Sequence, residues 1–205
     1  MGKCIDRSIS CQTRFQRYRS VEVEHCTLAR GIWTRLRNIA CMRKPLTRAG
    51  ILTISDTASR GGREDLSGQA IRELVASIGV EVAEYRIVPD EAESIAAVLR
   101  EWADERRVDL ILTTGGTGLS PRDVTPEATR LVLTREIPGM AEAMRLEGLK
   151  KTPRAMLSRA VGGARGSTLI VNLPGSPKGV RESLGAILEV IPHALEILQA
   201  RPSDH

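Results

Sequence analysis

Aromatic residues are scarce in this sequence, which has two Trp, two Tyr and one Phe among its 205 residues. A hydrophobic core must therefore be built from Leu, Ile, Val and Ala, and an apolar content of 41% suits one compact domain with a tail. The chain also lacks a run approaching the ~18 apolar residues that span a membrane. Its N-terminus lacks the apolar segment of a secretory signal. These absences argue against a membrane partner.

Cysteine is absent from most of the chain. The four cysteines all fall within the first 48 residues, as Cys4, Cys11, Cys26 and Cys41. They form no CxxC pair, which disfavours a zinc site, because paired zinc ligands normally lie two to four residues apart. Since residues 49–205 contain no cysteine, no disulfide framework supports them, and we expect a cytoplasmic location.

An excess of positive charge is confined to the same N-terminal segment. Residues 1–48 hold eleven Lys or Arg and three Asp or Glu, whereas the remaining residues hold 19 and 22. The net charge of +5 therefore describes this segment, and the sequence does not indicate a nucleic-acid partner. We expect residues 1–48 to be a disordered extension, or residues upstream of the true start codon. The acidic residues in the segment, Asp6, Glu22 and Glu24, count against an organellar transit peptide.

Regular patterning begins at about Gly50 and predicts an α/β fold. A short apolar run rich in β-branched residues predicts a strand at 50–55, and the segments 80–88, 109–114 and 167–171 are also typical of strands. Apolar residues at helical spacing predict helices between and after them, with N-caps at Ser67, Asp90, Thr125 and Ser176. This order predicts a three-layer α/β/α domain with a mostly parallel central sheet over residues 49–200, followed by a tail at 201–205.

Three polar loops follow predicted strands, at 55–68, 114–125 and 172–179. In parallel sheets, ligands gather at the loops beyond the carboxyl ends of the strands. We therefore expect the three loops to meet at one rim and to form the ligand site.

The second loop opens with a glycine-rich run of Thr114, Gly115, Gly116, Thr117 and Gly118. Glycines let the backbone adopt positive φ and bring N–H groups close to an anion, so the run can cradle a phosphate. It can also be an ordinary strand-to-helix turn. It is not a Walker A loop, because no Gly-Lys-Ser/Thr follows, and it lacks the third glycine of a dinucleotide fingerprint.

Two carboxylates are expected at the same rim. Asp123 precedes the helix that begins at Thr125 and Pro126, and Asp90 follows the second strand. Mg²⁺ is usually held by one or two carboxylates together with phosphate oxygens and water, so the pair predicts a magnesium–triphosphate site. The alternatives are structural, because Asp90 can serve as an N-cap and Asp123 can complement a helix N-terminus.

Further polar residues complete the expected rim. The third loop places Asn172, Leu173, Pro174, Gly175 and Ser176 after a strand, where the Asn172 amide could read the edge of a heterocycle. Candidates for a terminal-phosphate site are Ser158 and Arg159. The first loop adds Ser55, Asp56, Ser67 and Gly68. No cysteine or serine–histidine pair is placed as a nucleophile, so the site is expected to position phosphates and stabilise charge.

The motifs together resemble one known family. TGGTG followed by RDVTPEAT, with SDTASRG, DLSG, VPDE, LSRAVGGARG and NLPGSPKG in this order, is similar to the MogA/MoaB family of molybdenum-cofactor biosynthesis proteins. The resemblance runs from about Gly50 to Leu198. The order of the later motifs is most similar to the adenylyltransferase branch of the family. Residues 1–48 have no counterpart in it.

The resemblance implies an activity and a set of site residues. The implied reaction joins AMP from ATP to the terminal phosphate of molybdopterin and releases pyrophosphate, with Mg²⁺ present. The family's two important aspartates correspond to Asp90 and Asp123. Its nucleotide and pterin contacts correspond to Gly115–Gly118, Thr125, Pro126, Ser158 and Asn172–Ser176. A homotrimer or hexamer is implied, and a molybdate-insertion protein is the implied downstream partner.

Two other functions are compatible with parts of the pattern. One is a module that binds molybdopterin without adenylylating it, as in larger proteins that carry the same glycine loop beside additional domains. The other is the related fold of competence-damage proteins, which usually carry a second catalytic domain. The short chain and the two aspartates favour the adenylyltransferase over both.

Overall fold

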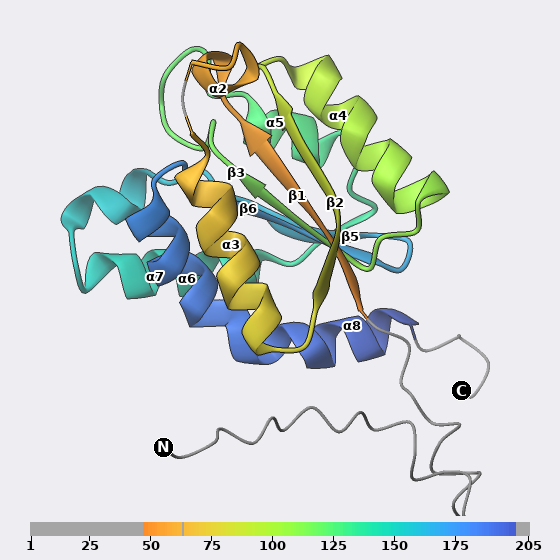
Figure 1. The fold of residues 1–205 in the computed structure, drawn as a ribbon. Helices are drawn as coiled ribbons and strands as arrows, with labels where there is room; N and C mark the ends of the chain where they lie inside the picture. Colours follow the sequence, from red (N-terminus) through yellow and green to blue (C-terminus); the bar gives the residue numbers. More distant parts are fainter. Residues whose placement is uncertain (1–46, 63, 200–205) are drawn as a thin grey trace, which may run out of the picture. The chain divides into compact units, whose positions relative to one another are not determined.

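A computed structural model describes residues 47–62 and 64–199 (Figure 1). The N-terminal extension predicted to be disordered comprises residues 1–48, of which 1–46 lie outside the described residues, as does the predicted tail at 201–205. The sheet itself begins at Arg48, slightly before the expected domain boundary.

The described chain forms a six-stranded mixed sheet with the order β2-β1-β3-β6-β5-β4. Strands β1 (Arg48–Ile54), β2 (Glu81–Val88), β3 (Leu110–Thr114) and β6 (Thr168–Leu173) are parallel neighbours. Strands β5 (Gly162–Arg165) and β4 (Arg135–Glu136) extend the sheet with antiparallel pairing. The mostly parallel sheet expected from the sequence is confirmed, and its four parallel strands correspond to the four predicted ones.

Helices cover both faces of the sheet, as Figure 1 shows. One face packs against α3 (Leu66–Ser77), α6 (Pro138–Leu149), α7 (Pro177–Ile187) and α8 (Ile191–Gln199). The other face packs against α4 (Ala92–Arg100) and α5 (Thr125–Arg130). The remaining short elements are α2 (Asp56–Ser59), the π-helical turn η1 (Glu101–Glu105), and the 3₁₀ turns η2 (Pro153–Leu157) and η3 (Leu188–Val190). The three-layer α/β/α prediction is confirmed.

The antiparallel strand β5 was not predicted from the sequence, because its first two residues are Gly162 and Gly163 and glycine disfavours strands. The structure shows why residue 163 is a glycine. A Cβ there would lie 2.5 Å from the carbonyl oxygen of Arg135 in β4. The glycine thus permits the close approach of the two strands.

Three of the four predicted N-caps are wrong, because Ser67, Asp90 and Thr125 do not hold the N-cap positions of the observed helices. Helix α3 is capped by Asp65, whose carboxylate accepts from the Gly68 amide at 2.9 Å, and not by Ser67. Helix α4 begins after Glu91 without a side-chain cap, and α5 begins with Thr125 itself. The cap at Ser176 is confirmed, since its hydroxyl accepts from Gly179 N at 3.1 Å.

None of the helices in the described ranges, 47–62 and 64–199, combines the length and apolar character needed to cross a membrane.

Candidate functional site

The parallel strands bring four segments to one edge of the sheet. Neighbouring strands β2, β1, β3 and β6 end in the order Val88, Ile54, Thr114 and Leu173, and the residues that follow them form the rim. The expected meeting of the three polar loops therefore occurs in the structure, with Asp90 added from the end of β2.

The glycine loop is built for close approach. Gly115 and Gly116 have φ values of +103° and +61°, which residues with a side chain rarely adopt. A Cβ on Gly115 would lie 2.2 Å from the Ile54 carbonyl oxygen, and one on Gly116 would lie 2.4 Å from Thr125 Oγ1. In the loop after β6, a Cβ on Gly175 would lie 3.2 Å from the Cα of Gly115. The loop after β6 thus packs directly on the loop after β3.

Asp56 and Asp90 exchange hydrogen bonds across the rim. The Asp56 amide donates to the Asp90 carboxylate at 2.9 Å, and the Asp90 amide donates to the Asp56 carboxylate at 3.2 Å. Arg122 forms an ion pair with Asp56 at 2.6 Å. Hydrogen bonding to Arg122 lowers the pKa of Asp56, so this carboxylate is ionised and held. The exchange fixes the position of Asp90 relative to the loop after β1.

Asp90 and Asp123 can hold a cation between the rim loops. Burial raises the pKa of Asp90, and the charges of Asp56 and Asp123 add to this effect. Asp123 accepts from the Ser120 amide at 2.8 Å, and a Cβ on Gly118 would lie 2.9 Å from it. A divalent cation would relieve the electrostatic cost of these carboxylates. No cluster of three or more His, Cys, Asp or Glu forms a metal site in the described residues, so phosphate oxygens and water would have to complete the shell.

Thr125 supplies a further polar atom beside the glycine loop. Its side chain is fully buried, and its hydroxyl has no hydrogen-bond partner among the described residues. The same Gly116 Cβ position that approaches Thr125 Oγ1 lies 3.1 Å from the Asp90 carboxylate. An unpaired buried hydroxyl is costly. Pro126, the next residue, is buried in the first turn of α5 and supports the helix without a polar contact.

Two hollows are lined in part by the glycine loop and the loop after β6. The first has a volume of about 250 Å³ and is lined by rim residues that include Ser55, Ser67, Asp90, Gly115, Gly116 and Gly175. Asp65 and Glu64 also line it, so its charged side chains are acidic. The Ser67 hydroxyl donates to the Gly175 carbonyl at 2.8 Å and closes one wall.

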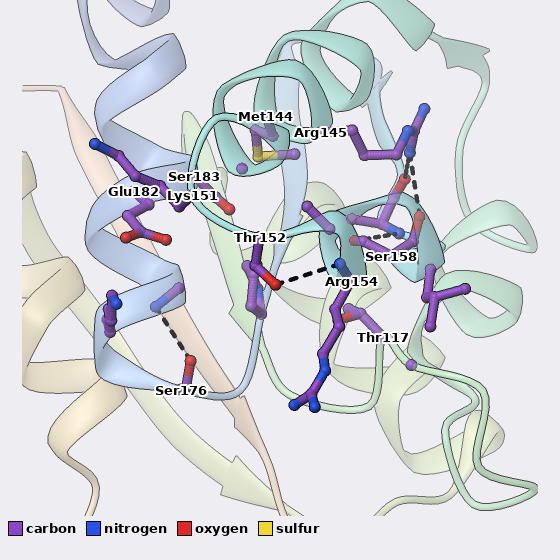
Figure 2. Close-up of a pocket in the computed structure, with 18 residues that line it drawn as sticks. Thr117, Met144, Arg145, Lys151, Thr152, Arg154, Ser158, Ser176, Glu182 and Ser183 are labelled. Carbon is purple, nitrogen blue, oxygen red and sulfur yellow. Dashed lines mark hydrogen bonds between the residues drawn. The ribbon is translucent and has the colours of Figure 1, made fainter.

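The second hollow has a volume of about 400 Å³ and is basic. Figure 2 shows Thr152, Ser158 and Ser176 around it, contributed by different segments. Its lining includes Thr117 and Gly118 from the glycine loop. The charged side chains in the lining are Arg145, Lys151, Arg154 and Lys178, against Glu182. This balance suits an anionic ligand.

Three predicted ligand residues have structural roles instead. The Asn172 side chain is fully buried, and its amide donates to Thr113 and Thr129 at 2.9 Å each and accepts from Val161 N. The prediction that it reads a heterocycle is therefore wrong, because these contacts occupy the amide within the fold. Leu173 is fully buried in the core, and the Thr114 hydroxyl is buried and donates to the Pro174 carbonyl at 2.7 Å.

Arg159 was predicted to contact a terminal phosphate, yet its guanidinium binds the protein. Nε donates to the Gly118 carbonyl at 2.7 Å, Nη2 donates to the Asp123 carbonyl, and Nη1 pairs with Glu127. The neighbouring Ser158 does line the basic hollow. The structure thus gives the two neighbouring residues different surroundings: Ser158 lines the hollow, and the Arg159 side chain binds other groups of the protein.

Several rim residues could not be found by sequence reasoning. Tyr85 and Thr53 donate to the Asp65 carboxylate at 2.7 and 2.5 Å, and burial with this hydrogen bond raises the pKa of Tyr85 to about 12. No motif marks Tyr85, since it lies in the middle of a strand. The basic residues of Lys150–Arg154 are the one sequence feature that could have indicated the second hollow. A run of this kind is equally typical of an ordinary solvent-exposed surface.

Comparisons with known proteins agree with this geometry. A family described as "Probable molybdopterin binding domain" matches residues 50–193. A molybdopterin adenylyltransferase of Helicobacter pylori strain J99 is 46% identical over 151 residues, covering 73% of this chain and 86% of that protein. Its counterpart in Escherichia coli K12 is 45% identical over 142 residues, covering 68% and 73%. The crystal structure of the molybdopterin biosynthesis enzyme MoaB from Thermus thermophilus superposes with a TM-score of 0.73 at 60% identity, covering 78% of this chain and 100% of that one.

Proposed function

The chain belongs to the family of probable molybdopterin-binding domains, and from this premise we propose that it transfers AMP from ATP to molybdopterin. An oxygen of the terminal phosphate of molybdopterin attacks the α-phosphorus of ATP. The bond from this phosphorus to the oxygen that bridges to the β-phosphorus breaks, and pyrophosphate leaves. The proposal is supported by the name shared by the relatives from Helicobacter pylori and Escherichia coli.

The observation that carries the proposal is the convergence of Asp90, Asp123 and the glycine loop at one rim, between two hollows of opposite charge. Two substrates have to meet for the transfer, and the glycine loop and the loop after β6 both contribute residues to the lining of each hollow. The loop glycines allow phosphate oxygens to approach the backbone.

Asp90 and Asp123 would hold Mg²⁺ in this reaction. The ion would supply positive charge against the triphosphate, as it does in other phosphoryl-transfer sites. Burial raises the pKa of Asp90, and the charges of Asp56 and Asp123 add to this effect, so a divalent cation beside the carboxylate would favour its ionised form. Arg122, which is paired with Asp56, keeps one of these charges compensated.

The proposal is tested by pyrophosphate release from the purified protein with ATP, Mg²⁺ and molybdopterin. We expect Asp123→Asn and Asp90→Asn to lower the rate by about 100-fold or more, as loss of charge stabilisation at a reaction centre does. Glu189→Gln, which changes an exposed carboxylate on η3, serves as the matched control. Unchanged rates in both aspartate variants would disprove the assigned roles.

The competing function is a module that binds molybdopterin without using ATP. It shares the fold and the basic hollow, so binding alone does not separate the two. Tight binding of molybdopterin by a protein that releases no pyrophosphate would establish this alternative. The carboxylate pair at the rim favours the enzyme, because a pure binding module does not need it.

We also propose that the chain assembles into a homotrimer or hexamer and acts in the cytoplasm, upstream of a molybdate-insertion protein. Support for assembly comes from exposed apolar side chains on α6 and η2, two elements that pack on each other. Leu146, Met156 and Leu157 are 64%, 61% and 50% exposed. Apolar patches of this kind commonly mark interfaces.

A further inference from the structure

Arg159 connects the chain after η2 to both ends of the loop that carries Asp123. We propose that Arg159 is a positioning residue, which holds Asp123 in place for the metal and does not itself contact substrate. The inference rests on the proposed function in assigning Asp123 to the metal. It assigns Arg159 a role different from the phosphate contact that the sequence suggested.

The contacts of Arg159 span the whole loop. Its backbone amide donates to the Thr117 carbonyl at 3.0 Å, and its Nε donates to the Gly118 carbonyl at 2.7 Å. Its Nη2 donates to the carbonyl of Asp123 itself, and its Nη1 forms an ion pair with Glu127 in the first turn of α5. One side chain therefore fixes where the loop leaves the glycines and where it enters the helix.

Apart from Arg159, the loop that carries Asp123 is tied to the rest of the rim by Arg122, which pairs with Asp56 at 2.6 Å. Asp123 N donates to the Ser120 carbonyl at 2.8 Å, and the Asp123 carboxylate accepts from the Ser120 amide at 2.8 Å. These two bonds form a turn that is closed on itself and would move as a unit. Leu119 at its tip is 64% exposed and gives no hydrophobic anchor. Arg159 is thus a main link between this turn and the helical layer.

The contacts also explain why the residue is arginine and why it is not free for a ligand. Two main-chain carbonyls and one carboxylate are reached in different directions by a rigid planar fork, which a lysine ammonium on a flexible stem cannot reproduce. Thr117, Gly118 and Ser158 line the basic hollow, whereas Arg159 is not part of its lining.

Partners that orient a metal ligand typically change metal affinity by about 10- to 100-fold when they are mutated. We therefore expect Arg159→Lys to raise the Mg²⁺ concentration for half-maximal pyrophosphate release by about 10-fold or more. The KM for molybdopterin should change by less than about 3-fold, and excess Mg²⁺ should restore much of kcat.

Arg165→Lys is the matched control. Arg165 is also a partly buried fork that binds one carboxylate, Asp104, and one carbonyl, that of Val132. It lies in β5, outside the rim and both hollows. Arg165→Lys should leave the Mg²⁺ concentration for half-maximal pyrophosphate release unchanged, even if the variant lowers the midpoint of unfolding.

A second measurement does not depend on activity. Hydrogen exchange of the Ser120 and Asp123 amides in Arg159→Lys should be about 10-fold faster than in the parent chain, because local opening of the loop becomes less costly. Exchange in β1 and β3 should be unaffected. This result can be obtained even if the parent chain releases no pyrophosphate, so failure of the proposed function and failure of this inference are distinguishable.

Two outcomes would overturn the inference. The first is an unchanged Mg²⁺ requirement with unchanged exchange in the loop. The second is a large rise in the KM for molybdopterin or ATP at saturating Mg²⁺, which would show that Arg159 contacts substrate directly.

Discussion

Asp90 holds its proton more tightly in the folded chain than in the unfolded one. Burial raises the pKa of this carboxyl above its ordinary value of 3.8, and the charges of Asp56 and Asp123 add to the shift. Since the folded state binds this proton more strongly, the ionised carboxylate costs stability above its folded pKa. The cost disappears as the pH falls below 3.8, where the group is protonated in both states.

We therefore expect Asp90→Asn to raise the midpoint of thermal unfolding at pH 7 in the absence of metal, even though it abolishes activity. An Asn oxygen can still accept from the Asp56 amide, so the hydrogen bond is kept. The gain should shrink as the pH approaches 3.8, the ordinary pKa of this group. Thermal unfolding followed by circular dichroism across this pH range measures it.

Asp104→Asn is the control of opposite sign. The hydrogen bonds from Arg165 hold the pKa of Asp104 below its usual range, so this carboxylate stabilises the fold at neutral pH and loses that effect on acidification. The variant should be less stable than the parent chain at pH 7. A fall in stability in Asp90→Asn as well would contradict the account of the rim.

Local sequence motifs identified many residues of the rim but misassigned several of their roles. Asp90 and Thr125 stand where N-caps are normally found, and no local pattern reveals that their side chains point to other loops. Asn172 follows a strand within a conspicuous Pro-Gly motif, yet its partners come from β3, α5 and the segment before β5. Such contacts depend on tertiary packing between segments far apart in the chain, and a single sequence does not contain them.

Two glycines of the described chain have different roles that the sequence alone does not separate. Gly79, after α3, has φ of +74° and nothing within 4 Å of an added Cβ, so it serves only backbone conformation. Gly115 has φ of +103° and an added Cβ would lie 2.2 Å from the Ile54 carbonyl oxygen. Backbone atoms of a central strand cannot move aside cheaply.

Gly79→Ala should lower the free energy of unfolding by about 1–2 kcal/mol, the cost of a left-handed conformation for a residue with a Cβ. Gly115→Ala should lower the free energy of unfolding by more than this, because the added Cβ would strain the backbone and also clash with β1. The variant should abolish pyrophosphate release. Urea unfolding and the release assay measure the two effects. Equal stability losses in the two variants would show that the loop yields easily and that close packing there is unimportant.

Elements with strong periodic patterns were predictable, and the others were not. Strands β1, β3 and β6 carry mostly apolar runs, since both faces of the central sheet are covered, whereas the edge strand β2 has an alternating pattern. Strand β4 has two residues, and β5 begins with glycines, so neither carries a pattern that local reasoning can use. Strand β5 is held by pairing with β6, and β4 by pairing with β5, so both depend on tertiary contacts that local patterns do not encode.

At the scale of the whole molecule, the exposed apolar side chains of α6 and η2 permit a direct test of assembly. Leu146→Glu combined with Met156→Glu should reduce the mass measured by light scattering to that of a single chain, because charges cannot be buried in an apolar interface without a partner. The matched control is Leu131→Glu, which alters a leucine that is 68% exposed at the end of α5. A parent chain that is monomeric at micromolar concentration would refute the proposed assembly.

The rim combines segments from early and late parts of the chain, so the ribosome completes some of them well before the others. Strands β1, β2 and β3 are neighbours in the sheet and contiguous in the chain, so they can pair as soon as residue 114 has left the ribosome. The rim is closed much later, when Gly175 reaches Gly115 and accepts from Ser67. A polyphosphate ligand would therefore bind a finished chain and not a nascent one. Its presence would protect completed molecules from proteolysis while leaving truncated ones exposed.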